Sequence, residues 1–260
     1  MMLFGLMSPE CAQNGASAEG ATKTLLACPV LSLFAVVFVA LVQGMASRKP
    51  RLLCLHGKDS NAEATAMQMM LLGLHDFDAS DAPCECVFAE GPHEAGKFDA
   101  ALSTAGRAWH AEGQPLEVGL KAVAEYVHRQ GPFDGAYAFS QGASMLAMLS
   151  DPAVWRAHGG SDEAPPWRYV IIGCGVDHLL SHADAPTLEL PLALPSLHII
   201  GQRDEHRVAS RSLAERFAAP AVVLEHEEGH SIPLALCDGG AAHDALLKQV
   251  QQFARQTLCT

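Results

Sequence analysis

The amino-acid sequence predicts an α/β fold, in which helices cover both faces of a mostly parallel sheet. Short apolar runs alternate with segments of helical periodicity from Arg51 onward, as in a sheet whose strands are joined by helices. A chain of 260 residues that is 49% hydrophobic can bury the core of one such domain and carry an appendage.

Six apolar runs are predicted to form the strands of this sheet. Each is short, is bounded by polar or turn-forming residues, and is mostly apolar along its length, as expected for strands buried on both faces. We expect strands at residues 51–55, 84–88, 133–140, 168–173, 196–201 and 221–225.

Helices are expected between these strands, because apolar residues recur there at helical spacing. The first expected helix carries Ala66, Met69, Met70, Gly73, Leu74 and Phe77. The second carries Leu116, Leu120, Val123 and Val127 and is closed by Gly131 and Pro132. Two more are expected near residues 207–217 and 241–255. Segments 90–115 and 151–167 are rich in Gly, Pro and Asp, and they are expected to be loops or partial lids.

Charge and cysteine content exclude some classes of protein. The net charge of −12 argues against a nucleic-acid partner, because nucleic-acid binding depends mainly on Lys and Arg that neutralise phosphates. The 8 cysteines include no C-x-x-C pair, and only Cys84 and Cys86 lie close together in the chain. This distribution favours a reduced compartment over a disulfide framework.

The first 48 residues are expected to be an extension that precedes a folded domain at 49–260. Residues 24–46 contain no charged side chain and are long enough for one membrane helix. Arg48, Lys49 and Arg51 follow this run, so a membrane anchor would leave the domain in the cytoplasm. A cleaved signal peptide and a functional start at Met45 are the alternatives.

A sharp turn that carries a serine is expected at the end of the third predicted strand. The stretch A-F-S-Q-G-A-S places Ser140 two residues after Ala138 and two before Gly142. A strand that turns abruptly into a helix admits only small side chains at these two positions and exposes the serine hydroxyl above the sheet. The pattern indicates a nucleophile elbow, with Ala138 where glycine is usual.

An elbow serine needs a histidine that accepts its proton and a carboxylate that orients the histidine. In α/β-hydrolases the carboxylate and then the histidine follow the serine along the chain. Asp204 follows the fifth predicted strand and His230 follows the sixth, so both should lie at the carboxyl edge of the sheet. We therefore predict a catalytic triad of Ser140, Asp204 and His230.

Other acids and histidines offer alternatives to this triad. Glu205 stands next to the predicted acid and could replace it. Asp177 and His178, which follow the fourth predicted strand, form a weaker alternative pair. His178 and His182 have helical spacing but no neighbouring acids typical of a metal site, so a surface or lid role is expected.

The stretch H-E-E-G-H also matches the zinc-protease motif H-E-x-x-H through His226, Glu227 and His230. That motif requires one helix that presents both histidines on the same face. Here Gly229 interrupts the stretch, Pro233 follows it and a β-branched strand precedes it. We therefore expect no metal ion at this position and assign only His230 a catalytic role.

Two backbone N–H groups should stabilise the oxyanion of the tetrahedral intermediate. Gln141 follows the nucleophile and should supply one. Lys58 lies in the loop after the first strand and should supply the other, while Gly57 permits close approach of the substrate. His56 is expected to be structural.

Apolar side chains near these motifs indicate where an acyl group binds. They are Trp109, Phe139, Met145 and Leu179. Because no acid or base beyond the triad is placed to meet a charged acyl group, we expect medium or long acyl chains to be preferred. Lys58 is the exception, since its ammonium group would favour a substrate carboxylate.

Taken together, these motifs resemble the FSH family of serine hydrolases. The resemblance covers about residues 49 to 256 and is most specific in G-P-F-D-G followed by F-S-Q-G-A. It implies an α/β-hydrolase fold with a small lid, hydrolysis of carboxylic esters and the roles assigned above to Ser140, Asp204 and His230. The sequence departs from the family at Ala138, at Lys58 where an aromatic is commoner, and at the residue after Trp109, which is histidine instead of a second tryptophan.

The leading hypothesis is a serine hydrolase without a cofactor, which cleaves small-molecule carboxylic esters through an acyl-enzyme. An acyl thioesterase is the nearest alternative, because the same site geometry serves both leaving groups. A ligand-binding protein with little turnover is the alternative from a different class.

Overall fold

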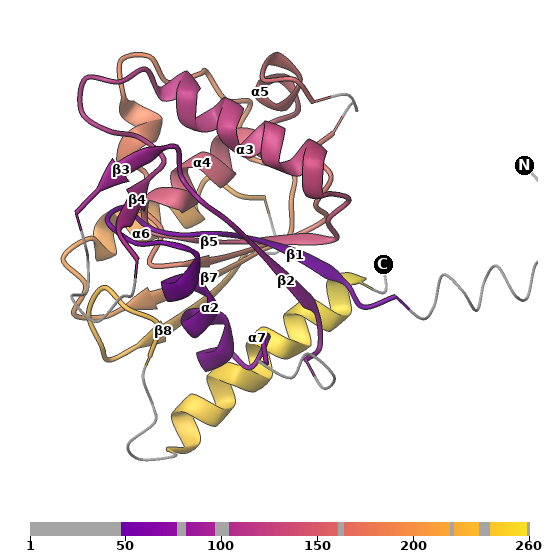
Figure 1. Ribbon diagram of the computed structural model, residues 1–260. Helices are drawn as coiled ribbons and strands as arrows, with labels where there is room; N and C mark the ends of the chain where they lie inside the picture. The colour runs from indigo at the N-terminus through magenta and orange to yellow at the C-terminus, as the bar shows by residue number, and fades with distance from the viewer. Residues whose placement is uncertain are drawn as a thin grey trace, which may run out of the picture. The chain divides into compact units, whose positions relative to one another are not determined.

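The computed structural model describes residues 48–76, 82–96, 104–160, 164–218, 221–233 and 240–258. Residues Lys49–Thr260 form one compact unit. Its centre is a six-stranded sheet in the order β2-β1-β5-β6-β7-β8, and every neighbouring pair of strands is parallel (Figure 1). The strands are β1 (Arg51–Leu55), β2 (Glu85–Ala89), β5 (Gly135–Phe139), β6 (Val170–Gly173), β7 (Ser196–Gly201) and β8 (Ala221–His226).

The strand order reverses direction at β1. The chain first places β2 on one side of β1 and then returns to add β5, β6, β7 and β8 on the other side. In open α/β sheets, the crevice at the carboxyl ends of the strands beside such a reversal is the usual place for a ligand. The loops that follow β1 and β5 leave the sheet at these carboxyl ends.

Helices cover both faces of the sheet, which confirms the predicted α/β architecture. Helices α3 (Leu116–Gln130), α4 (Gln141–Leu149), α5 (Pro152–Ala157) and α6 (Arg207–Ala214) contribute to one core cluster. Helices α2 (Ala62–Leu71) and α7 (Ala241–Leu258) contribute to the other, and Figure 1 shows them together on the opposite face from α3 and α4. A short 3₁₀ helix, η1 (His178–Ser181), follows β6.

Successive strand residues point to opposite faces, although both faces are buried. In β1, Leu53 and Leu55 belong to the α3/α4 cluster, whereas Leu52 and Cys54 belong to the α2/α7 cluster. This alternation is the period of two that a strand imposes. Helices on both faces explain why the strands appear in the sequence as continuous apolar runs.

The first helix ends earlier than its apolar spacing predicts. Helix α2 stops at Leu71, and Gly73 takes a left-handed backbone with φ +62°. Its N–H donates to Met70 O, and the N–H of Leu74 donates to Met69 O, so the chain closes the helix with a glycine cap. The prediction of a helix through Leu74 was wrong for this reason, and Phe77 lies outside the described residues.

The segments predicted as loops contain regular structure. Within 90–115, β3 (His93–Ala95) and β4 (Gly106–Ala108) pair as a small antiparallel sheet. Within 151–167, α5 begins at an N-cap where Asp151 Oδ1 accepts from Ala153 N at 2.8 Å, with Pro152 in the first turn. Both were missed because these elements are short and lack an apolar period.

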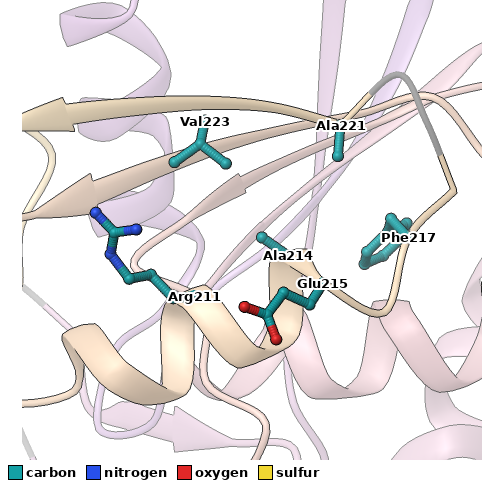
Figure 2. A pocket seen from close by; sticks show the side chains of 6 residues that line it. All are labelled: Arg211, Ala214, Glu215, Phe217, Ala221 and Val223. Carbon is teal, nitrogen blue, oxygen red and sulfur yellow. The ribbon is translucent and has the colours of Figure 1, made fainter.

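A cavity of about 370 Å³ lies between α6 and the edge strand β8 (Figure 2). Its walls are Arg211, Ala214, Glu215, Phe217, Ala221 and Val223. Ala221 begins β8 and Phe217 follows α6, so the cavity extends toward the amino ends of the strands. It is therefore separate from the loops at the carboxyl edge.

The apolar run at residues 24–46 lies outside the described residues. Across the part of the chain that the structure describes, no helix combines the length and apolar character needed to cross a membrane. The boundary between an extension at 1–48 and a domain at 49–260 stays a prediction.

Candidate active site

Ser140 lies at a strained turn between β5 and α4. Its φ of 50° is in the left-handed region, which a residue with a side chain rarely adopts. A Cβ on Gly142 would lie 2.5 Å from His56 O, so the chain admits only glycine there. Ala138 is fully buried and pairs with Leu55 in β1. The turn thus has the strand, strained residue and helix of a nucleophile elbow.

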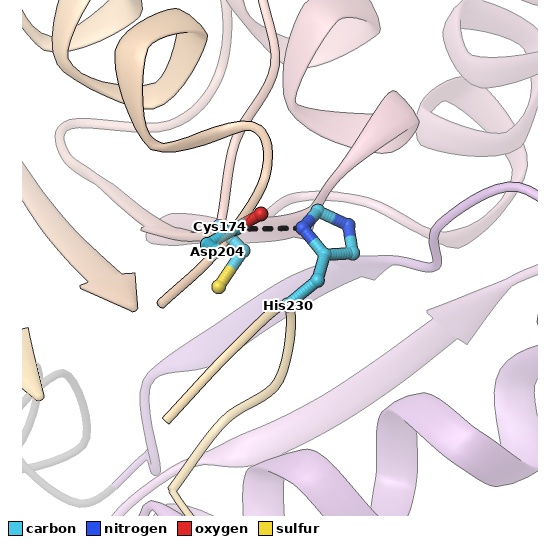
Figure 3. A group of neighbouring side chains, drawn as sticks. All are labelled: Cys174, Asp204 and His230. Atoms are coloured by element: carbon cyan, nitrogen blue, oxygen red, sulfur yellow. Dashed lines mark hydrogen bonds and ion pairs between the residues drawn. The ribbon is translucent and has the colours of Figure 1, made fainter. Parts of the chain in front are cut away.

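The structure brings the three residues of the predicted triad together. The distance from His230 Nε2 to Ser140 Oγ is 2.9 Å, and that from His230 Nδ1 to Asp204 Oδ2 is 2.8 Å. Because an ionised carboxylate only accepts, the His230 proton belongs on Nδ1. Nε2 is then left to accept from the serine hydroxyl. Figure 3 shows His230 facing Asp204 across this second hydrogen bond.

Asp204 is held by the backbone of its own loop. Its side chain is 0% exposed, and its second oxygen, Oδ1, accepts from His206 N at 2.7 Å. Both carboxylate oxygens therefore have a donor, as a buried charge requires. The alternative acid, Glu205, is 84% exposed and lies 3.8 Å from the His206 ring instead of meeting His230.

Two rings hold the imidazole of His230 in place. The Phe139 and His206 rings each lie 5.1 Å from it, centroid to centroid. The His230 side chain is 20% exposed, so it remains open to solvent on one side. The two ring contacts and the hydrogen bond to Asp204 therefore fix the orientation of the imidazole.

His56 holds the loop after β1 through hydrogen bonds of its ring. Its Nε2 accepts from Gly91 N at 2.9 Å, so the ring proton is on Nδ1, which donates to Gly57 O at 2.6 Å. Burial lowers the pKa of His56 to about 4, which keeps the ring neutral and preserves this pattern. A Cβ on Gly57 would lie 3.2 Å from Ser140 Cβ, so the loop that carries Lys58 lies directly against the serine.

The side chain of Gln141 makes long-range contacts that the sequence did not reveal. Its backbone begins α4 directly after Ser140, where the first N–H groups of a helix lack helical partners. Its buried side chain accepts from Trp109 N at 2.9 Å and from His110 N at 3.3 Å, and it donates to His110 O at 3.0 Å. The glutamine thus fastens the loop before α3 to the elbow. These long-range contacts have no signal in local sequence.

The four apolar residues predicted to line an acyl site lie in two different places. Trp109, Met145 and Leu179 are buried in the α3/α4 core cluster. Phe139 is buried in the α2/α7 cluster and contacts the His230 ring. The Trp109 indole donates to His56 O at 2.8 Å and stacks on the His56 ring, which shows a role in supporting the loop after β1.

The alternative acid and histidine pairs have other partners. Asp177 accepts from Ser212 Oγ at 2.6 Å and lies 3.5 Å from Arg216 Nη2, so α6 engages it. His182 bonds to Asp184, and its ring contacts His110 instead of His178.

The H-E-x-x-H stretch does not form a helix. His226 is the last residue of β8, and its Nδ1 accepts from Glu228 N at 3.3 Å. His230 lies in the following loop and bonds to Ser140 and Asp204. The zinc-protease motif requires both histidines on one face of a helix, and His226 and His230 do not meet this requirement.

Cys174 is a neighbour of the triad that the sequence analysis did not single out. It follows β6, is fully buried and takes a φ of 42°. One ligating atom each from Cys174, Asp204 and His230 lie within 4.8 Å of one another (Figure 3). The only signal in the sequence is the pattern G-C-G directly after a buried strand.

Comparisons with known proteins identify relatives of this chain. A profile of the serine hydrolase (FSH1) family matches residues 45–236, about three quarters of the chain. Esterase OVCA2 of Bos taurus is 37% identical over 141 residues, which are 54% of this chain and 58% of the bovine protein. Esterase C25G4.2 of Caenorhabditis elegans is 28% identical over 207 residues, covering 71% of this chain and 87% of the nematode protein. The match thus spans little more than half of the bovine relative.

A solved structure, "YahD with Malic acid", is similar in fold. It aligns with a TM-score of 0.52 and 11% identity over 80% of this chain and 93% of that one. At this identity the likeness concerns the fold alone. The parallel sheet, the elbow and the family match lead to one assignment: the chain has the α/β-hydrolase fold and belongs to the serine hydrolase (FSH1) family.

Proposed function

We propose that this protein hydrolyses carboxylic esters through an acyl-enzyme formed on Ser140. The observation that carries the proposal is the continuous chain of hydrogen bonds from Ser140 Oγ through His230 to Asp204, with distances of 2.9 and 2.8 Å. A serine in this arrangement can lose its proton to the imidazole as it attacks a carbonyl carbon.

The reaction proceeds in two halves. His230 Nε2 takes the hydroxyl proton as Ser140 Oγ bonds to the ester carbon, and it returns that proton to the departing alcohol. In the second half, His230 Nε2 takes a proton from water as the water oxygen bonds to the acyl carbon. It returns that proton to Ser140 Oγ as the bond from Oγ to the acyl carbon breaks and the acid is released. Asp204 keeps the imidazole in the required tautomer and stabilises its protonated form.

The tetrahedral intermediates require donors for their oxyanion. We assign these to the backbone N–H groups of Gln141 and Lys58. Support comes from the position of Gln141 at the first turn of α4 and from the close approach of Gly57 to Ser140, where a Cβ on Gly57 would lie 3.2 Å from Ser140 Cβ. The neutral His56 ring donates a hydrogen bond to the carbonyl of Gly57 and so fixes its orientation.

The decisive experiment combines covalent labelling with turnover. A fluorophosphonate probe should label the wild-type protein on one serine, and Ser140→Ala should abolish both labelling and hydrolysis of p-nitrophenyl esters. Loss of the nucleophile of a triad typically lowers kcat on the order of 10⁶-fold. Ser144→Ala is a matched control, because Ser144 is buried in α4 and donates to Val176 O instead of to the triad. Labelling that persists in Ser140→Ala would refute the assignment.

Within this function we propose that medium or long acyl chains are preferred and that residues 49–260 are the catalytic domain. The support is the apolar ring of Phe139, which packs against the ring of His230. Each buried methylene contributes about 0.8 kcal/mol, so kcat/KM should rise about fourfold per carbon from acetyl until the site is filled. A p-nitrophenyl ester series from two to about twelve carbons measures this, and a profile that falls from acetyl onward would contradict it.

A further inference from the structure

Cys174 occupies a backbone conformation that favours glycine. It has a φ of 42°, although glycines stand on both sides of it in the chain. Those glycines are needed for space, because a Cβ on Gly173 would lie 2.7 Å from Ile232 Cδ1 and one on Gly175 would lie 2.4 Å from Ile172 Cγ2. Residues with side chains that are held in the left-handed region cluster at functional sites, where neighbouring contacts stabilise them. The Cys174 side chain therefore needs an explanation.

The thiol of Cys174 connects three catalytic segments. Its Sγ donates to Ser231 O at 3.3 Å and lies 4.0 Å from Gly229 O, so it contacts the carbonyls on both sides of His230. Its backbone N–H donates to Ile199 O in β7 at 2.8 Å, and its Sγ lies within 4.8 Å of a carboxylate oxygen of Asp204. Cys174 thus joins the end of β6 to the segments that carry the acid and the base.

The Cys174 thiol stays protonated and can therefore donate a hydrogen bond. Cys174 is fully buried, and burial is the main cause that raises the pKa of its thiol to about 12. The thiol is therefore protonated at working pH and unsuited to act as a nucleophile. Cys54 provides a contrast: it is equally buried, but its Sγ donates to Leu52 O in its own strand at 3.5 Å and interacts with Cys86 in the neighbouring strand β2.

We propose that Cys174 is a positioning residue for His230: its thiol holds the loop of residues 229–231 against the ends of β6 and β7, so that His230 Nδ1 stays on Asp204. This inference rests on the function proposed above. In this role Cys174 affects catalysis by positioning His230 and does not contact the substrate.

Three variants of Cys174 separate this role from simple packing. Cys174→Gly removes the thiol and also relieves the backbone, Cys174→Ala removes the thiol alone, and Cys174→Ser keeps a donor for Ser231 O. Cys54→Ala is the matched control, because it removes a thiol of the same burial from the same core cluster. Fluorophosphonate titration counts the competent active sites, so each kcat refers to folded protein.

We expect kcat per titrated site to fall about tenfold in Cys174→Gly and Cys174→Ala, with KM changed less than about twofold, because a small displacement of the base lowers the rate without removing substrate contacts. Cys174→Ser should recover kcat to within about threefold of wild type, and Cys54→Ala should equal wild type. If the Gly and Ala variants keep wild-type kcat, or if Ser is as slow as Ala, the inference is overturned. A wild-type protein that is not labelled at Ser140 would instead overturn the proposed function.

Discussion

Two histidines four positions apart in the chain have different surroundings. His226 ends β8, and burial lowers the pKa of its ring. His230 lies in the loop, where it bonds to both Ser140 and Asp204. The sequence could distinguish them because a β-branched strand leads into His226 and Gly229 interrupts any helix, so the two side chains cannot serve one metal ion on a helical face.

Replacing each of these histidines by alanine should therefore have unequal effects. His230→Ala removes the base, and kcat/KM should fall by about 10⁴-fold or more. His226→Ala removes a ring whose one hydrogen bond accepts from Glu228 N, so activity should stay within about threefold of wild type. Steady-state kinetics with a p-nitrophenyl ester, before and after dialysis against a chelator, provides the measurement. Equal losses in the two variants, with activity that the chelator removes, would restore the zinc hypothesis.

At the scale of elements, the strands were predictable and some connections were not. Runs such as R-L-L-C-L and S-L-H-I-I-G are buried on both faces, and β7 has the bounds expected from the sequence. Helix α2 is shorter than predicted because Gly73 turns left-handed, and β3 and β4 are too short and polar to carry an apolar period. Local sequence reports burial and period, whereas these features depend on pairing with distant segments.

Strand β7 also carries a buried histidine that should make stability depend on pH. His198 is 1% exposed, and desolvation lowers its pKa from 6.5 to about 4. As pH falls below 6.5, the unfolded chain binds a proton at this residue and the folded chain does not, so stability is lost between pH 6.5 and about 4. One histidine of this kind lowers the free energy of unfolding by about 2 kcal/mol between pH 7 and 5.

The variant His198→Leu should remove this contribution. Its free energy of unfolding in urea should fall less than that of wild type between pH 7 and pH 5, by about 2 kcal/mol. Parallel losses in His198→Leu and wild type would show that the buried ring does not cause the effect.

At the scale of the molecule, the site is assembled from one edge of the sheet. Ser140, Asp204 and His230 follow β5, β7 and β8, and the loop with Lys58 follows β1 beside the reversal of strand order. The carboxyl ends of parallel strands lie at the same edge of a sheet. Once the strands are located in the sequence, the proximity of these residues can therefore be predicted. The side-chain contacts of Gln141 and Cys174 were not predictable in this way, because they depend on how the loops pack on one another.

Because every proposed catalytic residue follows a strand of this sheet, a chain that begins at Met45 should be sufficient for activity. The matched region of the family begins at the same residue, and β1 begins at Arg51. We expect the shortened protein to be soluble, to show cooperative unfolding, and to have a kcat/KM within about twofold of the full chain in detergent-free buffer. Among the residues that the structure describes, from 48 onward, the core clusters are already extensive. Aggregation of the shortened protein beside a well-behaved full chain would show that residues 24–44 are part of the folded domain.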